Sequence, residues 1–374
     1  IAILAAMVLL VYVKLVPAIS PDLVNYLFPW YDFIAAHGAW RSMGQFFANY
    51  TPPYLYLLAI GSLFDAALGK LAIIKLLSIL GNMILAAAAY DLVRHVMDRN
   101  HSLIVALCVM LLPSVAVNGP LWGQCDALYT AAIVFAVSCA LRQRWTLAMV
   151  AMGVGLALKL QVMFVAPACL VLLLRGKIRW WMLPIPVIVY YLMMVPALLA
   201  GRTLADVSLV YMGQFGFYHW LSGGAPNLWQ LIGDTVGYPA YRTGLIVGLI
   251  AGAATGLWIA LKGMKLRLDN PADLLLLFTA SALLLPYVLP KMHDRYFFAG
   301  TVLALLHAIV RKSGPAMLIA VCAELGSLIA SLSFLYGIGT PALAALFMTG
   351  AVLLSVLQLI DRARQQSVRP SSPA

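Results

Sequence analysis

Long apolar segments alternate with short polar loops along the whole chain. The apolar stretches run for roughly 17–25 residues, the length that a helix needs to cross a bilayer, and they recur throughout the 374 residues. Lipid offers the backbone no hydrogen-bonding partners, so each spanning segment must satisfy its own peptide groups as a helix. The segments do not alternate in hydrophobicity as the strands of a spanning barrel do. The pattern predicts an all-α polytopic membrane protein with about 11–12 transmembrane helices in one integral membrane domain, residues 1–361.

Composition supports the same class of protein. The chain is 64% hydrophobic and only 10% charged, whereas a soluble protein carries about 25% charged residues. Its net charge of +11 arises mainly in short loops, at Arg94, Arg99, Arg142, Arg144, Arg175, Lys177, Arg179, Lys262, Lys265, Arg267, Arg311, Lys312, Arg362 and Arg364. Basic loops are typical of the cytoplasmic side of a membrane protein, so the expected partners are membrane lipids and not nucleic acid. The five cysteines have no metal-ligand spacing and are expected to be small core residues.

The first external loop, residues 17–69, contains one apolar run that does not fit as a span. With the basic loops in the cytoplasm, the other spans alternate sides correctly only if residues 52–66 stay outside the membrane. A proline pair at the start of this run suits the first turn of a helix, and its two tyrosines suit a membrane interface. We expect 52–66 to lie as a helix on the outer membrane face. The aromatic-rich segment 22–40 is expected to form one or two further interfacial helices.

Three other regions complete the predicted organisation. The apolar segment 1–16 is expected to be a retained helix rather than a removed signal peptide. The stretch 145–174 begins and ends at basic loops and is too short for two full spans, so we expect a pair of short helices. Residues 201–240 form a second external loop, and residues 362–374 are expected to be a disordered cytoplasmic tail.

Unusual polar residues gather on the outer side of this topology, which places a candidate site there. Asp22 opens the first external loop directly after the first span. A carboxylate at this position can act as a general base, and the competing interpretation is a cap on the following helix. Asp32 and His37 in the same loop are expected to be solvated polar-face residues.

The segment Trp122-Gly-Gln124-Cys-Asp126 precedes a predicted spanning helix. Asp126 shares one face of that helix with Tyr129 and Thr130, which follow it by three and four residues. A carboxylate at the mouth of a span is costly unless it caps the helix or lines a wet space. The sequence leaves both interpretations open.

Lys159 lies within a strongly apolar sequence and is followed closely by Gln161. A cation at membrane depth requires an anionic partner. The phosphate of a lipid headgroup would serve, and so would Asp126 in a structural ion pair. A lysine that snorkels to the interface is the third interpretation. We expect the two short helices of 145–174 to fold around this point.

A second basic cluster, Pro290-Lys291-Met-His293-Asp-Arg295, stands at the predicted outer end of a later span. Lys and Arg bind phosphate oxygens through charge-assisted hydrogen bonds, although the same residues could anchor the span at the interface. Asn227 follows a Gly-Gly-Ala-Pro turn in the second external loop and is of a type common in sugar contacts. An ordinary structured loop is the better expectation for that turn.

Several familiar catalytic and nucleotide-binding motifs are absent from the sequence. The chain has no Walker A loop, no His-Glu-x-x-His, no Asp-x-Asp and no Gly-x-Ser-x-Gly. A nucleotide-activated donor on the cytoplasmic side is therefore not expected.

Five segments in order resemble the GT-C superfamily of polytopic glycosyltransferases, and more closely its bacterial mannosyltransferase-related members that use polyprenyl-phosphate sugars. They are Asp22 with Trp30-Tyr31 and His37-Gly38, then Asn49-Tyr-Thr-Pro-Pro-Tyr54, Trp122-Gly-Gln-Cys-Asp126, Lys159-Leu-Gln161 and Lys291-Met-His-Asp-Arg-Tyr296. The last motif commonly reads Met-His-Glu-Arg-Tyr, and Asp294 stands here in place of the glutamate.

The resemblance implies an inverting transfer of mannose or another hexose from a polyprenyl-phosphate donor to a lipid or glycan acceptor. The reaction would face outward at a bacterial cytoplasmic membrane, with Asp22 as the general base by position. Contacts with the donor phosphate are implied for Lys159, Lys291, His293 and Arg295. Contacts with the rest of the substrates are implied for Asn49, Tyr54, Trp122, Gln124, Asp126, Gln161 and Asn227. No cofactor is implied, and a divalent cation is not required because the leaving group is already a phosphate.

Two alternatives belong to other classes. A glycolipid flippase or transporter would need polar residues along its whole path, and this chain has little besides bases in the cytoplasmic half. An O-antigen ligase-like or polymerase-like enzyme would place key arginines and histidines in large external loops, and the loop 201–240 is modest for that role.

Overall fold

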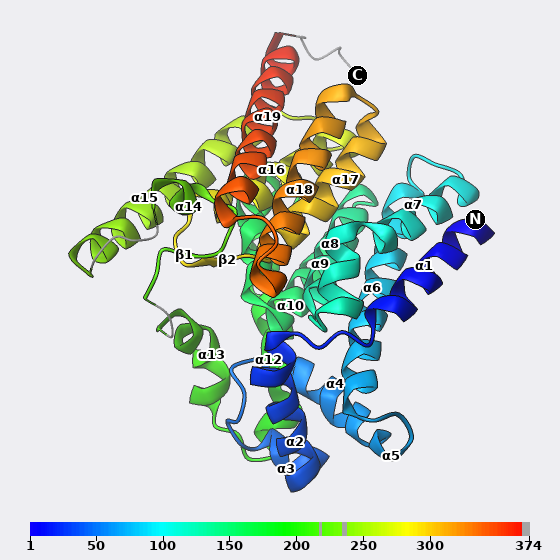
Figure 1. Ribbon diagram of the computed structural model, residues 1–374. Helices are drawn as coiled ribbons and strands as arrows, with labels where there is room; N and C mark the ends of the chain where they lie inside the picture. Colours follow the sequence, from blue (N-terminus) through cyan, green and yellow to red (C-terminus); the bar gives the residue numbers. More distant parts are fainter. Residues whose placement is uncertain (217–218, 234–237, 369–374) are drawn as a thin grey trace. The chain divides into compact units, whose positions relative to one another are not determined.

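The chain folds into two compact helical units. The computed structural model describes residues 1–216, 219–233 and 238–368 (Figure 1). The first unit comprises Ile1–Ala136, Thr146–Val162 and Leu183–Tyr218, and the second comprises Val137–Trp145, Met163–Met182 and His219–Ala374.

The described residues of the first unit form helices and the loops that connect them. Its elements are α1 (Ala2–Leu15), η1 (Leu23–Leu27), α2 (Phe28–His37), α3 (Ala39–Met43), α4 (Pro52–Ser62), α5 (Asp65–Leu68), α6 (Lys70–Val93), α7 (Arg99–Leu111), α8 (Pro113–Ala116), η2 (Val117–Leu121), most of α9 (Asp126–Leu141), α10 (Trp145–Leu158), the start of η3 (Leu160–Val165), α12 (Ile185–Leu199) and α13 (Leu204–Gly216).

The second unit contains the remaining helices and one pair of very short parallel strands. Its elements are α11 (Ala166–Leu174), η4 (Trp180–Met182), β1 (Ser222–Gly223), α14 (Leu228–Ile232), α15 (Tyr238–Gly263), α16 (Pro271–Val288), β2 (Met292–His293), α17 (Phe298–Arg311), α18 (Gly314–Tyr336) and α19 (Pro341–Val368). The strands pair Ser222 with Met292 and Gly223 with His293.

Among the described residues, six helices are long and apolar enough to cross a membrane. They are Lys70–Val93, Trp180–Leu199, Ala240–Gly263, Pro271–Val288, Gly314–Tyr336 and Pro341–Gln366. A seventh candidate is bent by 57° where α7 meets α8, because Pro113 keeps Leu112 in an extended conformation (φ −57°, ψ 123°). Five shorter apolar helices accompany them: Ala2–Leu15, Asp126–Leu141, Trp145–Leu158, Leu160–Leu174 and Phe298–Arg311. The polytopic all-α class is confirmed, and the count of 11–12 spans stays a prediction.

The predicted interfacial segments are short helices packed into one apolar core. α2 and α3 contact α4, and α4 contacts α6 (Figure 1), with Leu23, Ile34, Leu55 and Ile74 fully buried between them. α4 has only 11 residues, or about 16 Å of helix, against about 30 Å of hydrocarbon. The helix predicted over 52–66 is found over Pro52–Ser62, and the chain turns at residues 63–64 before α5 begins at Asp65. Its place on the outer membrane face stays a prediction.

The predicted break at Lys159 is also confirmed. α10 ends at Leu158, and the chain then turns through the 3₁₀-helix η3 before α11 begins at Ala166. Pro167 stands at the start of α11, where a proline costs the helix no hydrogen bond.

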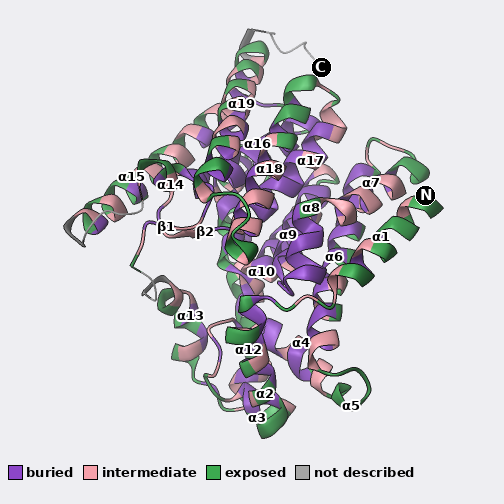
Figure 2. Cartoon of the chain, in the orientation of Figure 1, coloured by how far each residue is buried: buried purple, intermediate pink, exposed green. Residues whose placement is uncertain are grey.

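Small residues allow the helices of the second unit to approach closely, as is common in membrane proteins. A Cβ on Gly326 of α18 would lie 3.0 Å from the carbonyl oxygen of Ala344 in α19, and one on Gly300 of α17 would lie 3.0 Å from that of Ala282 in α16. α16 is buried along its length, whereas α15 exposes much of its apolar surface (Figure 2). Lipid is the natural cover for an exposed apolar helix face.

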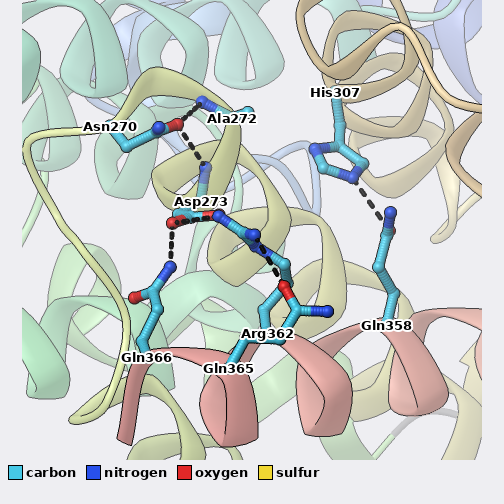
Figure 3. A network of polar contacts seen from close by, with 8 residues as sticks. All are labelled: Asn270, Ala272, Asp273, His307, Gln358, Arg362, Gln365 and Gln366. Atoms are coloured by element: carbon cyan, nitrogen blue, oxygen red, sulfur yellow. Dashed lines mark hydrogen bonds and ion pairs between the residues drawn. The ribbon is translucent and has the colours of Figure 1, made fainter. Parts of the chain in front are cut away.

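A polar network fastens the last helix to α16 (Figure 3). Asp273 accepts hydrogen bonds from Arg362 Nε (2.9 Å), Arg362 Nη2 (3.0 Å) and Gln366 Nε2 (2.5 Å). His307 Nε2 lies 2.9 Å from Gln358 Oε1, which joins α17 to the same helix. These bonds explain why α19 continues to Val368, so that residues 362–368 of the predicted tail are helical. Residues 369–374 lie outside the described residues.

Candidate active site

Asp22 is buried at the start of the first external loop, with 8% of its surface exposed. It lies just before the short helix η1. Trp122 Nε1 donates a hydrogen bond to Asp22 Oδ2 at 3.1 Å, and Gln124 Nε2 donates to the same oxygen at 2.6 Å. These two donors, 100 and 102 residues away along the chain, hold the carboxylate in one orientation.

The backbone of the two loops is joined as well. Ser20 Oγ donates to the carbonyl oxygen of Trp122 at 2.8 Å and accepts from the amide of Leu23 at 3.3 Å. Gly123 adopts a positive φ of +84°, which favours glycine, and a Cβ added to it would lie 3.2 Å from the side chain of Leu23. This turn places the side chains of Trp122 and Gln124 on the same carboxylate.

Asp126 begins α9 and forms the second part of the site. Only 2% of its surface is exposed. Lys159 Nζ donates to Asp126 Oδ1 at 2.5 Å, and Asn118 Nδ2 donates to Oδ2 at 2.8 Å. Of the interpretations left open for Lys159, the ion pair with Asp126 is therefore the one that the structure contains.

Tyr50 connects the two carboxylates. Its hydroxyl donates to Gln124 Oε1 at 3.3 Å, and Gln124 in turn holds Asp22. The ammonium of Lys159 lies 5.1 Å from the centre of the Tyr50 ring, a cation–π distance. Asp22, Gln124, Tyr50, Lys159 and Asp126 thus form one continuous chain of contacts, which we call the aspartate cluster.

Further predicted residues border the aspartate cluster. Tyr54 is 1% exposed, and burial raises the pKa of its phenol well above the usual value, with Cys125 and Tyr50 adding to the shift and Lys159 opposing it. The carbonyl oxygen of Asn49 accepts a hydrogen bond from Gln214 Nε2 at 2.5 Å. Gln161 is buried in η3.

The sequence interpretation did not assign Tyr50, Asn118 or Lys75 to the site. Lys75 is fully buried in α6, and its ammonium donates to the carbonyl oxygen of Leu121, one residue before Trp122. A charged residue in the middle of an apolar helix was a signal that could have found it. Tyr50 was within a quoted motif, but its contacts depend on residues 74 and 109 positions away.

Asp32 and His37 lie apart from the cluster, as expected. Asp32 pairs with Lys70 at 2.8 Å, and the two side chains are 57% and 40% exposed. His37 Nδ1 lies 2.9 Å from the carbonyl oxygen of Phe33, and its ring stacks on the Phe33 ring.

The second basic cluster belongs to the second unit. The backbone amide of Lys291 donates to the carbonyl oxygen of Leu221 at 2.7 Å, in a left-handed conformation with φ 62°. The ring of His293 contacts Trp220 and Tyr296, with ring centres 5.3 and 5.1 Å apart. Asn227 is fully buried, where its Oδ1 caps α14 and its Nδ2 contacts the carbonyl oxygen of Leu289. Arg295 follows β2 in the same unit.

No model of a known protein family matches the chain, and no curated protein is similar to it in sequence. Solved structures do share its fold. ArnT from Cupriavidus metallidurans in the apo state aligns with a TM-score of 0.53 at 16% identity, over 97% of this chain and 76% of ArnT. The same protein bound to undecaprenyl phosphate aligns with a TM-score of 0.56 at 13% identity, over 98% and 77%. The chain therefore shares the polytopic helical fold of ArnT.

Proposed function

We propose that this protein is an inverting glycosyltransferase of the outer face of a bacterial cytoplasmic membrane. It would move mannose or another hexose from a polyprenyl-phosphate donor to a lipid or glycan acceptor. Two observations support the proposal. The fold is similar to that of ArnT, one of whose structures contains undecaprenyl phosphate, and the first unit has two buried carboxylates joined through a tyrosine and a lysine.

The orientation of Asp22 is the observation that carries the proposal. A general base must be held at hydrogen-bonding distance from the hydroxyl that it deprotonates. Trp122 and Gln124 fix this carboxylate from a separate loop. In the proposed step the acceptor oxygen attacks the anomeric carbon of the donor sugar and its proton passes to Asp22. The bond between that carbon and the phosphate oxygen breaks, and the electron pair leaves with the polyprenyl phosphate.

Positive charge near the departing phosphate would stabilise the transition state. Lys159 supplies the positive charge of the aspartate cluster, and we assign it to the donor phosphate together with Lys291, His293 and Arg295. Asp126 holds the ammonium of Lys159 in place. Substrate contacts are proposed for Asn49, Tyr54, Trp122, Gln124, Gln161 and Asn227. Since the leaving group is already a phosphate, the reaction as written needs no cofactor and no metal ion.

The test is transfer from a radiolabelled polyprenyl-phosphate hexose in proteoliposomes. Asp22→Asn keeps the shape of the side chain and removes the base, so we expect activity to fall by roughly 10²–10⁴-fold. Asp32→Asn is the matched control, because Asp32 lies in the same loop but is exposed and paired with Lys70. We expect it to keep nearly all activity. Equal rates for wild type and Asp22→Asn would contradict the proposal.

A further inference from the structure

Arg202 is a buried guanidinium outside the aspartate cluster. It follows α12 in the turn before α13, and only 3% of its surface is exposed. Within the described part of the chain, none of its three side-chain nitrogen atoms has a hydrogen-bonding partner. Burying an ion without such partners is costly. A fold that keeps this arrangement therefore points to an anion that completes it.

The residues around Arg202 enclose it with aromatic surface. The guanidinium carbon lies 5.1 Å from the centre of the Phe46 ring, and that ring is 58% exposed, so it covers the arginine on the solvent side. Asp206 and the hydroxyls of Tyr56 and Tyr190 are close enough to affect the pKa of Arg202. Burial lowers the pKa of Arg202, and these three groups oppose the shift.

The polar groups near Arg202 are committed to other bonds. Asp206 Oδ2 accepts from the backbone amide of Thr203 at 3.3 Å, which caps α13. The hydroxyl of Tyr56 accepts from the amide of Ala197 at 3.0 Å, and that of Tyr190 donates to the carbonyl oxygen of Val207 at 2.5 Å. The carboxylate among these groups, Asp206, caps α13. It does not form a direct ion pair with the Arg202 guanidinium.

Two close approaches of the backbone build this environment. A Cβ on Gly44 would lie 2.2 Å from the carbonyl oxygen of Ala200, so the loop that carries Phe46 packs directly on the end of α12. Gly201 has a positive φ of +111°, and the amide of Arg202 then donates back to the carbonyl oxygen of Ala197 at 2.9 Å. The turn is thus fixed, and it directs the side chain under Phe46.

Arg202 and the aspartate cluster lie near different side chains of helix α4. The charges of Lys159 and Asp126 act on the pKa of Tyr54, whereas the charge of Arg202 acts on the pKa of Tyr56. Side chains two residues apart on a helix do not face the same side. The position of Arg202 also suits a particular ligand, because it lies three residues beyond the end of the span Trp180–Leu199, at the depth where lipid headgroups begin.

We propose that Arg202 forms a phosphate-binding site on the side of α4 away from the aspartate cluster, with the Phe46 ring as its cover. A guanidinium offers five N–H donors in a fork that matches phosphate oxygens. The phosphate belongs either to a membrane lipid or to a soluble phosphate. The site stands on the contacts of Arg202 and goes beyond the transfer reaction proposed above.

The experiment follows thermal unfolding of the purified protein in neutral detergent with three probes: inorganic phosphate, farnesyl phosphate and farnesol. Because a polyprenyl phosphate would also bind at the aspartate cluster in the reaction proposed above, the shift is compared between wild type and Arg202→Gln. We expect farnesyl phosphate to raise the unfolding midpoint of wild type more than that of Arg202→Gln, and farnesol to leave both unchanged. A shift with inorganic phosphate as well would assign the site to the phosphate group alone, and a shift with farnesyl phosphate only would assign it to a lipid. A shift with neither, or an equal shift with farnesol, would overturn the proposal.

Two variants locate the site. Arg202→Gln should weaken farnesyl phosphate binding by roughly tenfold or more and should raise the midpoint of the protein without ligand, because it removes an unpaired buried charge. Arg41→Gln, at an exposed arginine of α3, should behave like wild type. A lower midpoint or aggregation of Arg202→Gln without ligand would mean that the arginine is only a structural anchor for Phe46. Unchanged affinity in Arg202→Gln would also overturn the site, while leaving the transfer assay on Asp22 unaffected.

Discussion

Each unit of the protein buries a carboxylate against a cation, and the two pairs are built differently. In the first unit, Asp126 takes one bond from Lys159 and one from Asn118, and the ammonium also lies over the Tyr50 ring. In the second unit, Asp273 accepts two hydrogen bonds from the Arg362 guanidinium, through Nε and Nη2, and a third from Gln366 Nε2. Both donor residues lie on α19 (Figure 3).

This difference distinguishes an ion pair within the candidate active site, Asp126 with Lys159, from one that only holds two helices together, Asp273 with Arg362. Asp273 joins α16 to α19, and the network drawn in Figure 3 contains this carboxylate, the Arg362 guanidinium and side-chain amides. Asp126 begins α9, and Lys159 lies between α10 and η3. The pair is connected through Tyr50 and Gln124 to a second buried carboxylate, Asp22. Burial and charge alone are therefore poor guides to function. The informative feature is a second titratable group within the same contact chain.

A single substitution in either pair should lower stability, but only the substitution in the Asp126–Lys159 pair should lower transfer activity. Removing one partner of a buried pair costs about 3–5 kcal/mol, since the other charge stays buried. We expect that loss of unfolding free energy for Lys159→Met and for Arg362→Met, measured by denaturant titration in detergent. Transfer per folded molecule should fall by roughly 10²-fold or more only in Lys159→Met. Equal activity losses in the two variants would remove the distinction.

Replacing both partners of each pair sharpens the comparison. Well-packed apolar residues can substitute for a buried ion pair with little cost, so Asp126→Leu/Lys159→Met and Asp273→Leu/Arg362→Met should both regain most of the stability lost by the single variants. Transfer per folded molecule should stay near the wild-type level in the second double variant and remain low in the first. The measurement is the same denaturant titration combined with the transfer assay. Recovery of transfer in the first double variant would show that the Asp126–Lys159 pair also has only a structural role.

Two glycines with the same φ test the geometry of Asp22. Gly123 and Gly38 both have φ +84°, but a Cβ on Gly123 would lie 3.2 Å from Leu23, whereas one on Gly38 meets nothing within 4 Å. An alanine at either position should cost about 1–3 kcal/mol of stability from backbone strain. Only Gly123→Ala should also lower transfer, because it displaces Trp122 and Gln124. Matched kinetics in the two variants would argue against that role for the turn.

The smallest expected effect concerns Asp98, an exposed carboxylate with a purely local role. Its side chain caps α7 and bonds to His101, and the hydrogen bond from His101 holds the pKa of Asp98 below its usual value. A depressed folded pKa contributes stability above the unfolded pKa, and this is lost as pH falls through the folded value. Asp98→Asn should therefore lower the melting temperature slightly at neutral pH, with the gap closing in acid and transfer unchanged. A gap that grows on acidification would contradict the assignment.

Local sequence was enough to predict several features of this structure. The Pro52-Pro53 pair marks the start of α4, and the charge of Lys159 within apolar sequence marks the break between α10 and η3. Asp32 was expected to be solvated, and its side chain is 57% exposed. These features depend on neighbouring residues, whose propensities and spacing are visible in a single sequence.

The contacts that form the aspartate cluster could not be predicted in the same way. Trp122 and Asp22 are 100 residues apart, and Lys159 and Asp126 are 33 apart. Hydrophobic periodicity says which residues lie in helices, but it does not say which loops meet. The helical end of residues 362–368 was missed for the same reason, because it depends on Asp273 in another helix.

The most direct test of the central claim is a comparison of kcat and KM for polyprenyl-phosphate hexose in wild type and Asp22→Asn. If Asp22 is the base of an active site that binds the donor through other residues, kcat falls by roughly 10²–10⁴-fold while KM is unchanged. A wild-type kcat, or a change confined to KM, would contradict the account.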